Sequence, residues 1–181
     1  GRKNHEEIRK LQNLSDVSVI PSRNEPFGLV VIEGTACGHP VIATNAGGIP
    51  GILNTDNKDI SNKSKLYKTP LGILVPPLPE RPLKLNDEQK DKLDEYITEY
   101  CIVDEDKKSD IINEISENLK LEPSEIKEYI DRYMKTVNGI SDGVEGIALG
   151  KIKFDNDKIA NYTEEHYSQD IIRNKIIGIF D

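Results

Sequence analysis

Short apolar runs closed by proline or glycine constrain the fold of this chain more than any other feature. Three runs have the length of a strand, at 16–20, 41–44 and 72–75. Apolar residues at helical spacing lie beside them, at 6–13, 26–37 and 49–53. Short strands that alternate with helices need crossover connections, and such connections join parallel strands. The sequence therefore predicts an α/β fold with a parallel, Rossmann-like sheet.

The middle of the chain has a different pattern, with narrow apolar stripes on charged helices. Three helices are predicted there, from Asn86 or Asp87 to about Tyr100, over 108–119, and onward from Pro123. The stretch 87–135 contains 16 acidic and 8 basic residues, and its balance of −8 equals the net charge of the whole chain. The acidity is therefore a property of this helical segment alone.

The remaining residues complete the predicted domain organisation. Four glycines between 138 and 160 predict a loop with at most one strand, and a helix from Thr163 to Phe180 is predicted to follow. Residues 1–80 then form part of the α/β domain. Residues 81–160 are an inserted α-helical subdomain with a glycine-containing loop. Residues 161–181 are the closing helix of the α/β domain.

Composition and spacing disfavour several classes of protein. The net charge of −8 argues weakly against a nucleic-acid partner, because phosphate binding needs clustered lysine and arginine. No apolar run approaches 18 residues, and the first ten residues are polar, so neither a transmembrane helix nor a secretory signal is expected. The two cysteines and three histidines have no metal-ligand spacing, and no metal site is predicted. A cytoplasmic location is expected.

The segment 21–38 has the features of an anion site. Pro26 is predicted at the first helical position, which leaves the amides of Phe27, Gly28 and Leu29 without partners inside the helix. These donors and the positive end of the helix dipole attract anions, and Gly28 leaves room for a phosphate. Because the helix follows a strand, its start is expected at the carboxyl edge of the sheet, where open α/β folds bind ligands.

Two glutamates flank these amides. Glu25, at the mouth of the helix, can accept hydrogen bonds from sugar hydroxyls. Glu33 follows four apolar residues and is predicted to be buried, where a carboxylate needs donors such as a ribose diol. The alternatives are a solvated helix cap for Glu25, and for Glu33 a buried acid paired with an arginine or a backbone amide. Taken together with the amides between them, the pair favours a binding site.

The string from Ser15 to Leu53 resembles the donor-binding domain of a large family of retaining glycosyltransferases, group 1 or family 4, of GT-B fold. The resemblance rests on Glu25-x7-Glu33, on Ala36-Cys-Gly-His-Pro-Val-Ile-Ala-Thr44 and on Gly47-Gly-Ile-Pro50. It continues weakly at 72–77 and at Tyr167-Ser168. The resemblance implies that the sheet is part of the carboxyl-terminal half of a GT-B fold.

The resemblance also implies roles for single residues. Glu25 would be the catalytic carboxylate and touch the donor sugar, and Glu33 would bind the ribose. The amides of Phe27, Gly28 and Leu29 would hold sugar and diphosphate. Gly47 and Gly48 would line the cleft.

The implied reaction transfers a hexosyl group, with retention, from a nucleotide-diphospho-sugar to a hydroxyl of a sugar, a sugar phosphate or a lipid-linked acceptor. No cofactor and no obligatory metal are implied, because the helix end and basic side chains stabilise the leaving diphosphate. A cytoplasmic enzyme, free or peripheral at the inner membrane face, fits such a reaction.

Departures from the family pattern leave alternatives open. The family's basic pair is expected upstream of this segment, the acceptor domain is not recognised, and Gly51 stands where the family usually has an acidic residue. The segment alone is therefore expected to be inactive without an N-terminal domain or a partner chain. Two other interpretations remain: a non-catalytic nucleotide-sugar-binding subunit of a divided transferase, or another GT-B enzyme such as a phosphorylase or epimerase.

Overall fold

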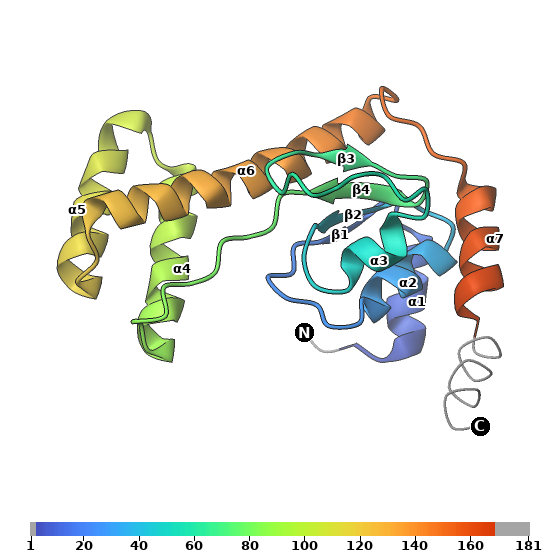
Figure 1. The fold of residues 1–181 in the computed structure, drawn as a ribbon, viewed down its shortest axis with the longest axis horizontal. Helices are drawn as coiled ribbons and strands as arrows, with labels where there is room; N and C mark the ends of the chain where they lie inside the picture. Colours follow the sequence, from blue (N-terminus) through green and yellow to red (C-terminus); the bar gives the residue numbers. More distant parts are fainter. Residues whose placement is uncertain (1–2, 169–181) are drawn as a thin grey trace. The chain divides into compact units, whose positions relative to one another are not determined.

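The computed structural model describes residues 3–168 (Figure 1). The chain divides into two compact units. Residues 78–135 form the helical unit, and the segments 1–77 and 136–181, before and after it, form the α/β unit. None of the helices in the described part is both long and apolar enough to cross a membrane.

The α/β unit contains one four-stranded sheet. Its strands are β1 (Ser18–Ile20), β2 (Val41–Thr44), β3 (Tyr67–Lys68) and β4 (Gly72–Val75), in the order β1-β2-β4-β3. The first three in this order are parallel, and β3 is antiparallel to β4. All residues of β2 and β4 are buried, as expected for central strands covered on both faces. The predicted α/β fold with a mainly parallel sheet is confirmed, as in the carboxyl-terminal half of a GT-B fold.

The helices of this unit are α1 (His5–Asn13), α2 (Leu29–Ala36), α3 (Ile49–Leu53), α7 (Asn156–Tyr167) and the last part of α6 (Pro123–Ala148). Helix α2 packs against α7. Apolar side chains from α2, α3, the strands and α7 form one core cluster, which includes Val31, Leu53, Leu74 and Ile159. This core supports the loops that leave the carboxyl ends of the strands.

The predicted loop over 138–160 is wrong for its first half, because α6 continues through Ala148. The glycines there follow the helical period, and two of them face the sheet. A Cβ atom at Gly139 would lie 3.2 Å from Val75 Cβ, and one at Gly143 would lie 3.0 Å from Ile42 Cδ1. These glycines therefore let the helix backbone approach the sheet closely, which compensates for their low helix propensity.

The predicted start of the last helix at Thr163 is also wrong. Helix α7 begins at Asn156, where the Asp155 side chain accepts the Lys158 amide at 3.1 Å and caps the helix. Thr163 lies inside α7 and donates its hydroxyl to the Ile159 carbonyl oxygen at 2.9 Å. The remainder of the predicted closing helix, 169–181, lies outside the described residues.

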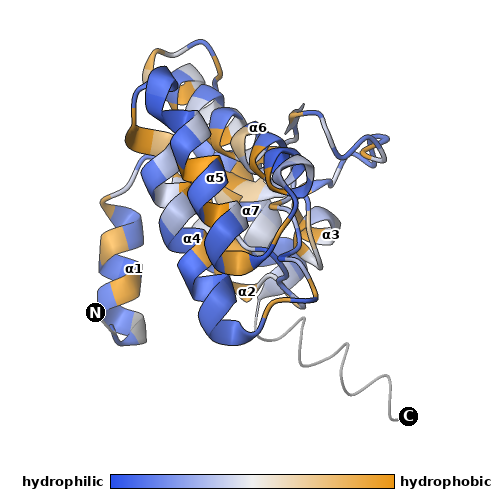
Figure 2. Cartoon of the chain, turned by 90° about the vertical axis from the view of Figure 1, so that its left-hand side faces the viewer, coloured by the Kyte–Doolittle hydropathy of each residue, from blue (hydrophilic) through white to orange (hydrophobic). Residues whose placement is uncertain are grey.

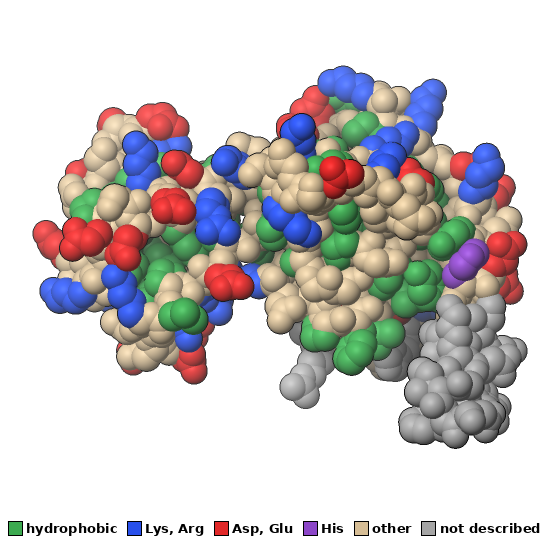
Figure 3. Space-filling model, viewed as in Figure 1, with side chains coloured by type: hydrophobic (Ala, Val, Ile, Leu, Met, Phe, Trp, Pro, Cys, Tyr) green, Lys and Arg blue, Asp and Glu red, His purple; other side chains and the backbone are tan. Residues whose placement is uncertain are grey.

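A separate helical unit lies in the region where the α-helical subdomain is predicted. It contains α4 (Asp87–Ile102), a 3₁₀ turn (Glu105–Lys107), α5 (Lys108–Leu119) and the first part of α6. Apolar residues form bands along these hydrophilic helices (Figure 2) and meet in a cluster that includes Leu93, Ile97, Ile115 and Ile130. Charged side chains of both signs are scattered over the face of this unit that Figure 3 shows. Its bounds, 78–135, are narrower than the predicted 81–160 at the carboxyl end.

Candidate functional site

The loops that follow the parallel strands are joined at the carboxyl edge of the sheet. The Thr44 hydroxyl, at the end of β2, donates to the Ser22 carbonyl oxygen at 2.5 Å, just beyond β1. The next amide, that of Asn45, donates to the carbonyl oxygen of Val75, the last residue of β4, at 2.8 Å. Both Thr44 and Asn45 are buried. The carboxyl ends of three strands therefore form one connected edge, the usual ligand-binding edge of such sheets.

At Gly47 and Gly48, the backbone of the loop after β2 contacts the backbone of the loop that leads into α2. The Gly48 amide donates to the Glu25 carbonyl oxygen at 2.7 Å. A Cβ atom at Gly48 would lie 2.6 Å from the Pro26 carbonyl oxygen, and one at Gly47, whose φ is +56°, would collide with the Glu25 backbone. Only glycine fits this backbone contact. The structure thus brings Glu25, Gly47 and Gly48 together.

The start of α2 differs from the prediction. The helix begins at Leu29, Gly28 is its N-cap residue with φ +72°, and Pro26 and Phe27 lie in the loop. The predicted position of Pro26 in the first helical turn is wrong, because the left-handed backbone of Gly28 interrupts the helix. The Gly28 amide is already bonded to Glu25 Oε1 at 3.0 Å. The Glu25 carboxylate therefore occupies one of the three donors expected for an anion.

The other amides at this helix end are available. Within the described residues, the amides of Phe27, Leu29 and Val30 have no hydrogen-bond acceptor, whereas that of Val31 donates to the Gly28 carbonyl oxygen at 2.9 Å. Phe27 and Leu29 are 77% and 60% exposed, whereas Gly28 between them is buried. A Cβ atom at Gly28 would lie 2.5 Å from Ile52 Cδ1, so the space that Gly28 was expected to leave for a phosphate is occupied by Ile52. Three donors at the positive end of a helix can bind a phosphate group.

Glu33 lies one helical turn after Leu29, on the same face of α2 and about 6 Å further along the axis. It is half-buried rather than buried, because only the opposite face of α2, at Val31, is fully covered. Glu33 lines a hollow of about 460 Å³ between α1 and α2, together with Arg9 and Gln12. A carboxylate, a guanidinium and an amide there can bind a hydroxylated group.

Arg9 and Glu33 both act on the thiol of Cys37, which lines the same hollow. Burial raises the pKa of Cys37, Arg9 opposes this effect, and Glu33 raises the pKa further. Arg9 is therefore close to Glu33. The alternative interpretation of Glu33, an acid paired with an arginine, requires such a neighbour.

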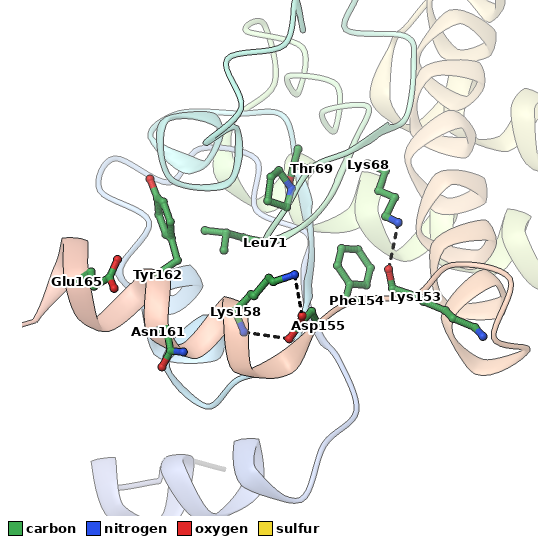
Figure 4. A pocket seen from close by; sticks show the side chains of 11 residues that line it. Lys68, Thr69, Leu71, Lys153, Phe154, Asp155, Lys158, Asn161, Tyr162 and Glu165 are labelled. Carbon is green, nitrogen blue, oxygen red and sulfur yellow. Dashed lines mark hydrogen bonds and ion pairs between the residues drawn. The ribbon is translucent and has the colours of Figure 1, made fainter.

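A second hollow lies at the opposite, amino edge of the sheet (Figure 4). It has a volume of about 540 Å³ and includes Leu71, Phe154 and Tyr162 in its lining. Lys68 Nζ donates to the Lys153 carbonyl oxygen at 3.0 Å and stands 5.1 Å from the centre of the Phe154 ring. None of the predicted site residues lines this hollow. The two edges of the sheet therefore present separate surfaces.

Two residues at the carboxyl edge were not predicted as site residues from the sequence. Asn45 joins the sheet edge to the segment 54–66 through its side chain, and Lys63 returns from that segment to bond Asn45. Asn45 directly follows a strand, which is the usual signal for a residue at this edge. Lys63 lies in a polar segment without periodicity, so no pattern indicated its position. No group of three or more His, Cys, Asp or Glu residues in the described range could hold a metal ion.

Comparison with known proteins shows which family the first part of the chain resembles. Residues 1–65 match the family model of glycosyl transferases group 1, which covers every predicted site residue. The predicted family resemblance is thereby confirmed for this first part of the chain. Residues 1–65 are therefore similar in sequence to glycosyl transferases group 1.

Individual relatives support the same assignment over short spans. The chain is similar to an uncharacterised glycosyltransferase of Methanocaldococcus jannaschii, with 45% identity over 53 residues, or 29% of this chain and 15% of the relative. It is 49% identical over 45 residues to the D-inositol 3-phosphate glycosyltransferase of Corynebacterium jeikeium, which is 25% of this chain and 11% of the relative. It is 43% identical over 49 residues to the glycogen synthase of Mycobacterium tuberculosis, which is 27% of this chain and 12% of the relative. The matched part is thus 15% or less of each of these relatives.

Proposed function

We propose that this chain supplies the donor-binding part of a retaining hexosyltransferase whose substrates are a nucleotide-diphospho-sugar and a hydroxyl acceptor. The acceptor-binding part is supplied by an N-terminal domain or by a partner chain. One observation gives the main support. The Gly47-Gly48 turn, the Glu25 carboxylate and the first amides of α2 lie at one edge of the sheet, in a segment that matches the group 1 family.

The geometry suits each part of such a donor. The amides of Phe27, Leu29 and Val30 would bind the diphosphate at the positive end of α2. Glu33, one turn further along the same face, would accept hydrogen bonds from the ribose hydroxyls. Glu25, in the loop before α2, would contact the hexosyl group. In this assignment the Glu25–Gly28 hydrogen bond orients the carboxylate toward the sugar.

During transfer, the bond between the anomeric carbon and the diphosphate oxygen breaks, and a bond to the acceptor oxygen forms on the same face. The nucleoside diphosphate leaves with the bonding electrons, and its oxygen takes the proton of the acceptor hydroxyl. Negative charge therefore grows on the diphosphate oxygen in the transition state. Fixed amide donors stabilise this charge without reorganisation and without an obligatory metal.

A donor-panel assay tests this function. The complete protein, with its acceptor domain or partner, is expected to release a nucleoside diphosphate from one nucleotide-diphospho-sugar when a hydroxyl acceptor is present. The product is expected to have the anomeric configuration of the donor. The 181-residue chain alone is expected to bind the donor without turnover. Turnover by this chain alone would contradict the proposed division of labour, and release with phosphate as acceptor would favour a phosphorylase.

A further inference from the structure

The buried side chain of Asn45 joins the polar segment 54–66, between α3 and β3, to the carboxyl edge of the sheet. Asn45 is 2% exposed. Its Nδ2 donates to the Ile60 carbonyl oxygen at 3.2 Å, which holds the middle of the segment next to the end of β2. A buried amide with both ends bonded is a specific anchor. The segment is therefore positioned at the edge that we assign to the donor.

Lys63 extends from this segment back to the same edge. Its ammonium group donates to Asn45 Oδ1 at 2.6 Å and to the Asn45 carbonyl oxygen at 3.3 Å. The Asn45 amide is bonded to the end of β4, and two residues further on, Gly47 begins the turn that contacts Glu25. A positive charge is thus fixed next to the Gly47-Gly48 turn.

Asn45 binds the Lys63 ammonium group without neutralising its charge. Within the described residues, both acceptors of Lys63 are uncharged amide oxygens, and no carboxylate lies within ion-pair distance. Its neighbour in the same segment, Lys58, is paired with Asp56 at 2.8 Å. An ammonium group has three donors, and Asn45 engages two of them. As far as the described residues go, one donor and a full charge therefore remain for a ligand.

We propose that Lys63 binds the diphosphate of the donor and supplies positive charge to the leaving group at this site. This inference rests on the proposed function, since it takes the carboxyl edge to be the donor site. It adds a residue that none of the motifs of the resemblance, all within 15–53, includes, although Lys63 lies within residues 1–65 that match the family model. Asn45 is then the positioning residue that keeps the Lys63 ammonium group at the edge.

Calorimetric titration of the 181-residue chain tests the inference, with UDP, ADP, GDP and inorganic pyrophosphate as probes. Lys63→Gln removes the charge and keeps a hydrogen-bonding side chain. It is expected to weaken binding of the preferred nucleoside diphosphate about 10-fold or more, as loss of a charge-assisted bond does. Lys63→Arg keeps the charge and is expected to retain most of the affinity. Lys65→Gln is the matched control, because Lys65 is exposed in the same segment.

The salt dependence of binding distinguishes an electrostatic role of Lys63 from a structural one. The parent chain is expected to lose affinity as ionic strength rises, and Lys63→Gln is expected to lose less. Unchanged affinity in Lys63→Gln, or equal losses in Lys63→Gln and Lys65→Gln, would overturn the role of Lys63 and leave the proposed function intact. Equal losses in Lys63→Gln and Lys63→Arg, with an unchanged salt slope, would show that the residue is structural. Failure of the parent chain to bind any of the probes would overturn both proposals.

Discussion

The Gly48 amide and the Glu25 carbonyl oxygen form a 2.7 Å hydrogen bond that joins the loop after β2 to the loop before α2. Gly48→Ala should break this contact, because the new Cβ would lie 2.6 Å from the Pro26 carbonyl oxygen, a backbone atom that cannot turn aside. We expect a loss of about 1–3 kcal/mol in local stability, as for other overpacked sites. Hydrogen exchange of the Gly28 and Gly48 amides measures this loss.

Gly51→Ala is the control for that substitution. A Cβ atom at Gly51 would meet nothing within 4 Å, and Gly51 lies inside α3. Alanine there should be neutral or stabilising by roughly 0.5–1 kcal/mol. Equal exchange rates in Gly48→Ala and the parent chain would show that the backbone contact between the two loops does not stabilise the site.

If the proposed function holds, Glu25→Gln in the complete protein should lower turnover far more than donor affinity. A glutamine oxygen can still accept the Gly28 amide, so the loop should keep its shape. In the proposed site the lost negative charge would face the sugar, where charge develops only during transfer. A roughly 100-fold fall in kcat is expected, comparable to the removal of one stabilising group. Steady-state kinetics gives the answer, and an unchanged kcat would mean that Glu25 is only a helix cap.

Glu33→Gln should weaken binding of a nucleoside diphosphate about 10-fold and leave binding of pyrophosphate unchanged. The reason is that pyrophosphate lacks the ribose that we assign to Glu33. Both affinities can be measured by calorimetry on the 181-residue chain, with the melting temperature as a control for folding. A lower melting temperature with full nucleotide affinity would instead support a structural acid next to Arg9.

Deletion of the helical unit should leave the α/β unit folded. The two ends of the insertion meet, since the Thr136 hydroxyl donates to the Pro77 carbonyl oxygen at 3.1 Å. A short glycine-serine linker can therefore replace residues 78–135, as expected for a domain inserted between adjacent points of a host. The deletion variant should keep a cooperative melting transition and nucleotide affinity. Loss of the transition, measured by circular dichroism, would show that the helical unit belongs to the core.

The sequence predicted β2, β4, α3 and α5 at their observed bounds, because short apolar runs and amphipathic stripes are strong local signals. The glycines of α6 were misinterpreted because close packing against the sheet, which no local pattern reports, overrides their low propensity. The start of α2 was misplaced for a related reason. Pro26 signals a first helical turn, yet the left-handed Gly28 delays the helix by three residues.

The candidate site was predictable where it is contiguous in sequence and not where it depends on long-range contacts. The amides after Glu25 and the Gly47-Gly48 turn follow from strand–loop–helix order. The backbone contact between Gly48 and Glu25, and the return of Lys63 to Asn45, join segments 23 and 18 residues apart. Such pairings depend on how loops pack in three dimensions, so spacing along the chain cannot reveal them.

The most direct test of the central claim is an amide chemical-shift map of the ¹⁵N-labelled 181-residue chain during titration with UDP-glucose, ADP-glucose and GDP-mannose. One of these donors is expected to shift the amides of Gly28, Leu29, Gly47 and Gly48 together. The amides of Leu71 and Phe154, at the opposite edge of the sheet, should not move. Shifts confined to that opposite edge, or no shifts with any donor, would contradict the assignment of the donor site.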